Sequence, residues 1–275
     1  MHSYLSSEGN LIAMKLAVES HGNGEPLVLI HGLGSAATAW KPLTKLLVND
    51  FQVITVDLPG HGNSPFSLNQ PMDPTSLAKL VVKNVKGLGI EKFNLIGNSL
   101  GGWIALEMAA NHEENIKSVV ALAPAGLWLT PFTSRYPGEV ALRVIAGGAN
   151  KLAPSVLNYS WAKKIGFETV SPKWRDLDYE ICLDATNAMA KSLGYFPTWD
   201  ALLGKRFDKK INKDIPITII FGDTDHTLPA KTCQERSLAP DHAKWLILSN
   251  TGHAPMWDST DQVYAEVMST VGSIL

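Results

Sequence analysis

The sequence predicts an α/β fold: a mainly parallel central β-sheet flanked by helices, with an inserted helical cap. Three observations lead to this prediction. Short runs rich in valine, isoleucine and leucine alternate with helix-like segments, which is the pattern of a parallel sheet covered by helices. Several runs are almost entirely apolar, as expected for strands buried on both faces. Between residues 126 and 210 the alternation stops, and prolines divide the chain into short pieces.

The expected elements follow in order along the chain. Strands are expected where aliphatic runs lie between glycine, proline, asparagine or aspartate residues, at residues 11–18, 27–31, 52–57, 93–96, 116–122, 217–221 and 244–248. Helices are expected where apolar residues recur every three or four positions, at residues 36–48, 74–85, 100–111, 231–238 and 262–274. A chain of 275 residues can form one sizeable core, so we predict a core domain of residues 1–125 and 211–275.

The segment of residues 126–210 is predicted to be a helical cap inserted over the functional edge of the sheet. It holds 12 of the 22 aromatic residues, and ligand sites are usually lined by apolar and aromatic side chains. The alternative is a structural excursion with a small core of its own. In either case, most of these aromatic side chains are expected to pack against one another.

Composition and charge argue against several classes of protein. The net charge of −2 and the pI near 6.4 disfavour a nucleic-acid-binding protein, which usually has a basic surface. The two cysteines, Cys182 and Cys233, lack metal-site spacing and indicate a reducing compartment. The N-terminus lacks the basic region of a signal peptide, and no apolar run approaches the ~18 residues of a membrane span. We therefore expect a cytoplasmic protein without a membrane partner, and the sequence leaves the oligomeric state open.

The stretch LIGNSLGGW, residues 95–103, places a serine between glycines where a strand runs into a helix. In this setting Gly97-x-Ser99-x-Gly101 matches the nucleophile elbow, a tight turn that exposes the serine hydroxyl. Glycine is needed on either side because larger side chains would collide with the strand or the helix. The N-terminus of the following helix favours negative charge. The motif also arises by chance, so the hypothesis requires a base and an acid.

Of the eight histidines, His253 has the setting of a catalytic base, on a short loop after the last expected strand in WLILSNTGHAP. The acid is expected after the preceding strand, in ITIIFGDTDHTLP, where Asp223 and Asp225 are available. Both also fit an ordinary turn, but the spacing of the flanking glycine and proline favours Asp225. The order Ser99, Asp225, His253 is the nucleophile–acid–base order of one large group of hydrolases.

These motifs make the sequence similar to the α/β-hydrolase fold superfamily along nearly the whole chain. The resemblance rests on HGLG (31–34), DLPGHGNS (57–64), GNSLGG (97–102), GDTDHTLP (222–229) and TGHAP (251–255). It implies a catalytic triad of Ser99, Asp225 and His253. It also implies an oxyanion hole made by the backbone N–H groups of Leu33 and Leu100. Neither a metal nor an organic cofactor is implied.

A rival interpretation is an NAD-dependent oxidoreductase. The pattern G-x-G-x-x-A at residues 32–37 follows a strand, and Asp57 ends the next strand about 20 residues later, as in a dinucleotide-binding fingerprint. This interpretation leaves the elbow and the motifs GDTDHTLP and TGHAP unexplained. In the hydrolase interpretation, the glycines let backbone N–H groups approach the reacting oxygen, while His31, Asp57 and His61 shape the loops.

Two alternatives remain within the hydrolase fold. The first is a protein that only binds ligands, which an intact triad disfavours. The second is a carbon–carbon bond hydrolase of the meta-cleavage-product type, which often carries GNSMGG. Such enzymes usually also have a Gly-Pro-Gly type oxyanion loop and a tryptophan after the histidine, where this chain has HGLGSAA and Ala254. We therefore predict a serine hydrolase that cleaves a carboxylic ester or similar acyl compound through an acyl-enzyme. Its partner is expected to be a small-molecule substrate with an apolar or aromatic part.

Overall fold

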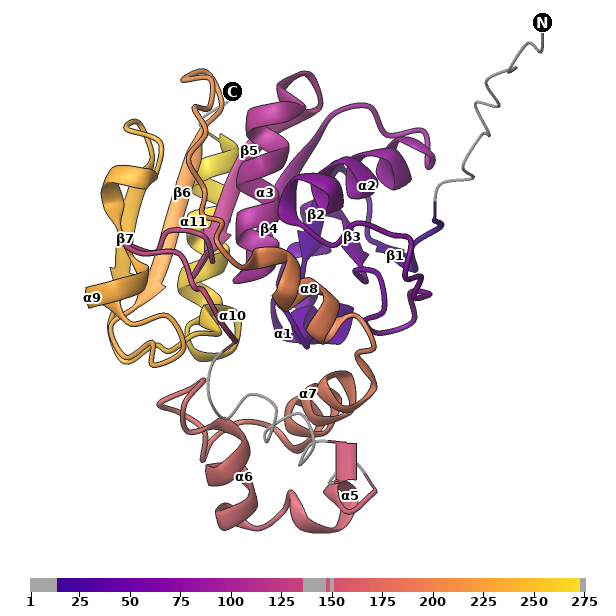
Figure 1. Cartoon of the computed structure of the whole chain (residues 1–275), viewed down its shortest axis with the longest axis vertical. Coiled ribbons are helices and arrows are strands. Elements are labelled where there is room, and N and C mark those ends of the chain that lie inside the picture. The colour runs from indigo at the N-terminus through magenta and orange to yellow at the C-terminus, as the bar shows by residue number, and fades with distance from the viewer. Residues whose placement is uncertain (1–13, 136–146, 149–150, 273–275) are drawn as a thin grey trace, which may run out of the picture.

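The computed structural model describes residues 14–135, 147–148 and 151–272 (Figure 1). Within these residues, seven strands form one sheet in the order β1-β3-β2-β4-β5-β6-β7. The strands are β1 Val18–His21, β2 Glu25–Ile30, β3 Phe51–Val56, β4 Phe93–Asn98, β5 Ile116–Leu122, β6 Ile217–Gly222 and β7 Lys244–Leu248. Strand β1 runs antiparallel to β3, and the other neighbouring pairs are parallel. The predicted α/β fold with a mainly parallel sheet is therefore confirmed.

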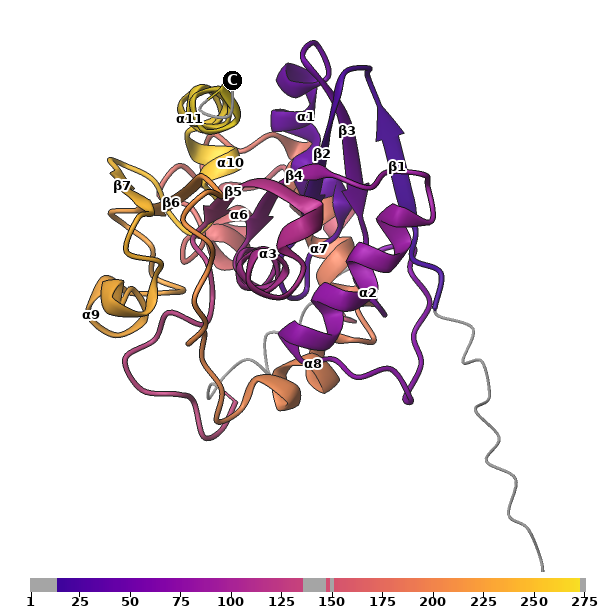
Figure 2. The same cartoon turned by 90° about the horizontal axis from the view of Figure 1, so that it is seen from above.

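Helices cover both faces of the sheet (Figure 2). The core helices are η1 Ala37–Trp40, α1 Lys41–Leu47, α2 Pro74–Lys86, α3 Leu100–Asn111, η2 Glu113–Asn115, α9 Ala230–Cys233, η3 Arg236–Leu238, α10 Pro255–Asp258 and α11 Thr260–Gly272. Alternate residues of β2 face opposite ways, as they do in any strand. Leu27 and Leu29 pack on the side of α1 and α11, whereas Val28 and Ile30 pack on the side of α2 and α3. All four are at most 1% exposed, so the apolar runs in the sequence reflect a sheet buried on both faces.

The prediction of a strand at residues 11–18 was wrong for residues 14–17, because β1 begins only at Val18. The N–H groups just before it bond to side chains, while the Ala17 carbonyl accepts the backbone N–H of Asp57 at 3.0 Å. The Leu16 N–H donates to Asn84 Oδ1 at 2.9 Å, and the Ala17 N–H donates to Ser64 Oγ at 2.8 Å. Residues 11–13 of this prediction lie outside the described residues.

Two predicted helices are each divided in the structure. Residues 36–48 form η1 and then α1, because Pro42 lacks the N–H that one continuous α-helix would require there. Residues 231–238 contribute to α9 and η3. Between these two helices, the Glu235 N–H donates to the carbonyl of Leu127 at 2.7 Å, so this backbone leaves the helical pattern to bind another segment.

The insertion segment, which we define as residues 126–210, carries α5 Ala153–Val156, α6 Ser160–Phe167, α7 Tyr179–Lys191 and α8 Tyr195–Leu202. Helices α5, α6 and α7 gather at one end of the sheet (Figure 1). Six buried residues of this segment form a small cluster apart from the main core: Ala153, Leu157, Phe167, Trp174, Leu177 and Cys182. Near its two ends, Trp128 and Phe207 pack into the main core instead.

Several aromatic side chains of the insertion segment stack in a row against the core. Trp128 packs edge-on against Trp103 of α3, with ring centroids 5.2 Å apart. Phe132 continues the row at 4.9 Å from Trp128 and 5.8 Å from Trp199. This is the mutual packing expected from the sequence, and it attaches the insertion segment to the helix that follows the candidate nucleophile.

Candidate active site

The residues predicted for the site lie on loops at one edge of the sheet. Strands β2, β4, β6 and β7 belong to the parallel part of the sheet, so their carboxyl ends lie at the same edge. The loops that follow these strands carry, in turn, Leu33, Ser99, Asp225 and His253. Topology therefore gathers residues that are far apart in the chain.

Ser99 occupies the tight turn between β4 and α3 with φ 54° and ψ −116°. A positive φ is unusual for a residue with a side chain and stores strain that the surroundings must hold. The Ser99 N–H donates to the carbonyl of Leu122 at 2.9 Å, and the Ser99 carbonyl accepts the N–H groups of Trp103 and Ala125 at 3.1 and 2.9 Å. The backbone of β5, its following loop and α3 thus hold the turn, and the serine stays partly exposed.

The two glycines of the motif are required by close backbone approach. A Cβ at position 97 would lie 2.1 Å from the carbonyl oxygen of Gly101. A Cβ at position 101 would lie 2.0 Å from the carbonyl oxygen of Ile30. Both distances are far inside van der Waals contact, so the structure agrees with the steric reason given for the motif.

His253 and Asp225 form a buried pair. His253 Nδ1 lies 2.9 Å from Asp225 Oδ2, and both residues are under a tenth exposed. The second oxygen of Asp225 accepts the N–H groups of Thr227 and Leu228 at 2.9 and 2.8 Å. These bonds fix the orientation of the carboxylate, and the carboxylate in turn makes Nδ1 the protonated nitrogen of a neutral imidazole.

Asp223, the other acid available in this loop, is placed differently. Its side chain is exposed, and Oδ1 accepts the N–H of Thr251 at 3.3 Å. Gly222 before it has no room for a Cβ, which would lie 1.9 Å from the carbonyl oxygen of Thr251. The loop therefore turns Asp223 toward solvent and brings Asp225 to the histidine.

Asn98 links the elbow to the histidine loop, although sequence reasoning did not single it out. Its Nδ2 donates to the carbonyl of His253 at 3.0 Å and to that of Leu122 at 3.2 Å. Its position directly before Ser99 was the available signal. Among the described residues, no hydrogen bond joins Ser99 Oγ to the His253 ring. Catalytic hydrogen bonds often tighten only when substrate is bound.

The predicted oxyanion-hole residues border the serine. A Cβ at position 32 would lie 3.1 Å from Ser99 Cβ, so the loop that continues into Leu33 lies against the nucleophile. Leu100 is the first residue of α3, and a first-turn N–H has no acceptor within its own helix. The N-terminal end of α3 also contributes positive potential at this point.

His31 shapes the loop that carries Leu33. It is fully buried, its Nδ1–H donates to the Gly32 carbonyl at 2.7 Å, and Nε2 accepts the Leu58 N–H at 3.0 Å. Burial lowers the pKa of His31 from 6.5 to about 4, against a smaller opposing effect of the bond to Gly32. The ring is therefore neutral at physiological pH, and both nitrogens are engaged by backbone.

Asp57 and His61 hold the neighbouring loop. Asp57 is 4% exposed, and its two oxygens accept the N–H groups of Ala37 and Asn63 at 2.7 and 2.8 Å. His61 Nδ1–H donates to the carbonyl of Pro59 at 3.0 Å. A ribose-binding acid would need free oxygens, so the position of Asp57 counts against the dinucleotide interpretation.

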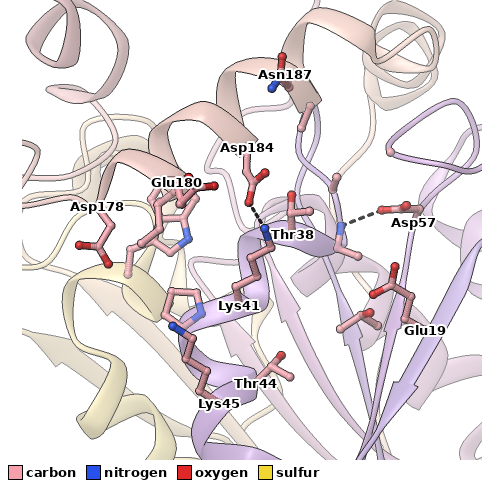
Figure 3. A pocket seen from close by; sticks show the side chains of 18 of the residues that line it. Glu19, Thr38, Lys41, Thr44, Lys45, Asp57, Asp178, Glu180, Asp184 and Asn187 are labelled. Carbon is pink, nitrogen blue, oxygen red and sulfur yellow. Dashed lines mark hydrogen bonds and ion pairs between the residues drawn. The ribbon is translucent and has the colours of Figure 1, made fainter. Parts of the chain in front are cut away.

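A groove of about 1070 Å³ lies between the insertion segment and the core (Figure 3). Lys41 of α1 and Asp184 of α7 form an ion pair beside it, with Nζ 2.5 Å from Oδ2. In the part of the chain that the structure describes, the residues lining this groove do not include Ser99, Asp225 or His253. The groove therefore lies where the insertion segment meets the core, and it is separate from the candidate site.

The described residues offer neither a cluster of metal ligands nor a membrane span. They contain no group of three or more histidine, cysteine, aspartate or glutamate side chains placed to hold a metal ion. None of the helices described is both long enough and apolar enough to span a bilayer.

Comparison with known proteins agrees with the geometry. Residues 25–260 match the model of a family described as alpha/beta hydrolase fold. A pimeloyl-[acyl-carrier protein] methyl ester esterase of Legionella pneumophila is 27% identical over 250 residues, which cover 90% of this chain and 95% of the relative. The Aeromonas hydrophila protein of the same name is 25% identical over 266 residues, covering 94% and 100%.

Solved structures share the fold at lower identity. A thermophilic esterase from Thermogutta terrifontis has a TM-score of 0.68 and 18% identity, covering 94% of this chain and 93% of the other. A meta-cleavage product hydrolase from Pseudomonas fluorescens has a TM-score of 0.71 and 20% identity, covering 94% and 95%. The relatives named as esterases also confirm the predicted reaction class, ester hydrolysis. With the family match spanning most of its length, the chain belongs to the alpha/beta hydrolase fold family.

Proposed function

We propose that the protein is a serine hydrolase that cleaves a carboxylic ester, with Ser99 as nucleophile, His253 as base and Asp225 as the acid that orients the base. The observation that carries the proposal is the buried 2.9 Å pair of His253 Nδ1 and Asp225 Oδ2, located at the sheet edge where Ser99 stands in a strained turn. A carboxylate on Nδ1 selects the tautomer whose Nε2 accepts a proton, and it stabilises the imidazolium that forms.

The reaction proceeds in two halves. Ser99 Oγ attacks the ester carbonyl carbon while its proton passes to His253 Nε2. The N–H groups of Leu33 and Leu100 receive the developing oxyanion, a stabilisation of about 3 kcal/mol per donor in the transition state. His253 then protonates the departing alcohol. In the second half, His253 takes a proton from water, the resulting hydroxide attacks the acyl-enzyme, and the carboxylic acid leaves as Ser99 regains its proton.

The proposal includes the insertion segment as a cap over this site, with the core domain at residues 1–125 and 211–275. Gly34, next to Leu33, has φ +73° and lies directly beneath the insertion segment. A Cβ at position 34 would lie 2.7 Å from Met189 Cε and 2.9 Å from Tyr195 Cε2. These two side chains come from α7 and from the start of α8, and they approach the proposed oxyanion loop.

This placement supports a small-molecule substrate with an apolar part. Met189 and Tyr195 present apolar surface near the loop that would receive the carbonyl oxygen, and apolar walls are usual in ligand pockets. The stacked aromatic row that includes Trp128 and Trp199 is occupied in packing against α3, so it gives no comparable support for an aromatic substrate. The names of the relatives indicate methyl esters of acyl chains as the first substrates to test.

The test combines active-site labelling with a substrate panel. Purified wild-type protein, Ser99→Ala and His253→Ala are treated with a fluorophosphonate, and the intact masses are recorded over time. We expect one adduct on the wild type, none on Ser99→Ala, and labelling of His253→Ala slowed by about 10³-fold or more. The panel holds methyl esters of increasing acyl length, thioesters, lactones and a meta-cleavage product.

Each outcome of this test has a defined meaning. Turnover of esters together with labelling at Ser99 supports the proposal. Faster turnover of the carbon–carbon substrate than of any ester would replace it with the meta-cleavage alternative. A folded wild type that neither labels nor hydrolyses any member of the panel would overturn it, and bound NAD detected in that sample would restore the oxidoreductase interpretation.

A further inference from the structure

The loop that carries His253 is held partly by the insertion segment. The His253 N–H donates to the carbonyl of Val170 at 2.7 Å. A Cβ at position 252 would lie 2.2 Å from that same carbonyl oxygen and 3.0 Å from Pro172 Cδ. Backbone of the insertion segment and backbone of the histidine loop are thus in direct contact.

A buried carboxylate reinforces this contact. Asp258, at the end of α10, is 6% exposed. Its Oδ2 accepts the Gly252 N–H at 2.8 Å, and its Oδ1 accepts the Ser171 hydroxyl at 2.5 Å. Lys173 donates its N–H to Ser171 Oγ at 3.0 Å and its ammonium group to the carbonyl of Asp258. One carboxylate therefore joins the histidine loop to residues 171–173 of the insertion segment.

The burial of these groups shows that the contact is a packed junction. Ser171 is 1% exposed, so its hydroxyl has no access to bulk water. Burial raises the pKa of Asp258, and the hydrogen bonds from Ser171 and Gly252 oppose this increase. A buried carboxylate is costly unless its oxygens are satisfied, so removal of the Ser171 hydroxyl would leave one oxygen of Asp258 without its partner.

We propose that Ser171 and Asp258 are positioning residues. Through them, the position of the His253 side chain depends on how the insertion segment docks against the core. The inference rests on the proposed function of His253. Two consecutive backbone N–H groups, those of Gly252 and His253, bind Asp258 and Val170 respectively. The peptide between them sets the direction of the His253 side chain. That side chain must meet Asp225 on one nitrogen and the Ser99 proton on the other.

Such a positioning role affects the rate of the catalytic step more than the binding of substrate. Displacement of the histidine by about 1 Å lowers the rate of proton transfer by up to 10²-fold, since catalytic groups act only within narrow limits of distance and angle. The side chains of Met189 and Tyr195, which the proposal places near the substrate, lie elsewhere on the insertion segment, in α7 and at the start of α8. Loosening of residues 170–173 should therefore lower kcat while KM changes little.

The ion pair of Lys41 and Asp184 supplies a matched control (Figure 3). It also joins the insertion segment to the core, through α7 and α1, but it has no contact with the histidine loop among the bonds recorded for the described residues. Asp184→Asn removes the negative charge from this insertion–core contact and so weakens it. A general effect of a weakened junction would appear in that variant as well.

The experiment compares Ser171→Ala, Asp258→Asn and Asp184→Asn in the full chain, with an ester that the wild type hydrolyses. For Ser171→Ala we expect kcat to fall about tenfold with KM within about twofold. Asp258→Asn keeps an acceptor for the Gly252 N–H and a donor for Ser171 Oγ, so its kcat should stay within about threefold. Asp184→Asn should retain the kcat of the wild type within about twofold. Thermal unfolding identifies variants that remain folded.

Fluorophosphonate labelling provides the decisive second measurement. If Ser171 acts through the histidine, the Ser171→Ala variant is labelled about tenfold more slowly than the wild type. The double variant Ser171→Ala, His253→Ala is then labelled no more slowly than His253→Ala alone. An equal slowing in both backgrounds would assign Ser171 a general structural role and overturn the inference. So would a folded Ser171→Ala with the kcat of the wild type. Should Ser171→Ala not fold, Ser171→Cys keeps a weak donor on a somewhat larger side chain, and a fall in kcat of about threefold is expected.

Failure of the proposed function gives a different result from failure of this inference. If wild-type protein is neither labelled nor active, the proposed role of His253 is wrong, whatever the Ser171 variants show. If wild-type protein is labelled at Ser99 while the Ser171 and Asp184 variants respond alike, the function stands and the positioning role does not.

Discussion

The elbow after β4 and helix α6 of the insertion segment are packed in opposite ways. At the elbow, a Cβ on Gly97 or Gly101 would lie within 2.1 Å of backbone oxygen. The turn donates a hydrogen bond to β5 and accepts hydrogen bonds from α3 and from the loop after β5. In the insertion segment, a Cβ on Gly166 would meet nothing within 4 Å. Trp161 and Ile165 on the same helix are 59% and 66% exposed.

This difference separates the part that is proposed to perform the chemistry from a part that surrounds it. Backbone in close contact cannot shift by an ångström without a clash, so it keeps a strained serine and a buried acid–base pair in register. Short helices around a small cluster tolerate changes in their side chains. The insertion segment is also closely packed where it meets the proposed machinery, at the contact of residues 170–173 with the His253 loop and at Met189 and Tyr195 beside Gly34.

The largest effect is expected at the acid. Asp225→Asn should lower kcat by about 10³- to 10⁴-fold, because an amide does not hold the required histidine tautomer. Asp223→Asn is the matched control, two residues away and exposed, and its kcat should stay within about twofold of the wild type. Steady-state kinetics decides the point: equal losses in the two variants would remove Asp225 from its role.

A large loss of stability is expected at the elbow itself. Gly101→Ala places a methyl group 2.0 Å from the carbonyl oxygen of Ile30, and the backbone there has no room to relax. We expect the free energy of unfolding to fall by about 3 kcal/mol or more. Urea denaturation followed by circular dichroism measures the change. A stable Gly101→Ala protein would show that the elbow is looser than its geometry indicates.

His31 should make the core sensitive to acid. Its folded pKa of about 4 lies below the 6.5 of the free side chain, so between these values the unfolded chain binds the proton and the free energy of unfolding rises with pH. From pH 7.5 to pH 5, His31 alone should lower this free energy by about 2 kcal/mol. Urea titrations of the wild type and His31→Gln at both pH values isolate this contribution. Equal pH dependence in the two proteins would contradict it.

The smallest effect is expected in the insertion segment. Gly166→Ala lies in α6, where the added methyl group has open space, and alanine lowers the entropy of the unfolded chain. We expect a gain of about 0.5 kcal/mol in the free energy of unfolding, with unchanged kcat. Thermal unfolding and a standard ester assay test both statements. A loss of activity would show that the insertion segment is coupled to the site more widely than at residues 170–173.

The sequence alone was sufficient for the sheet, the elbow and the candidates Ser99, Asp225 and His253. Strands buried on both faces leave continuous apolar runs, and a tight turn leaves glycines at fixed spacing. These are local requirements, so a few neighbouring residues are enough to show them in the sequence. The order of strands and loops then places the site residues at the edge where the structure finds them.

Only the tertiary structure decided the contacts between distant segments. Local sequence only favoured Asp225 over Asp223, and burial of Asp225 beside His253 is what separates the two. Residues 14–17 belong to a run that was predicted as a strand, but the N–H groups of Leu16 and Ala17 bond to side chains far along the chain. The link from Ser171 through Asp258 to the histidine loop spans 87 positions. Such contacts depend on how packed elements meet in space, and no periodicity in a single sequence records them.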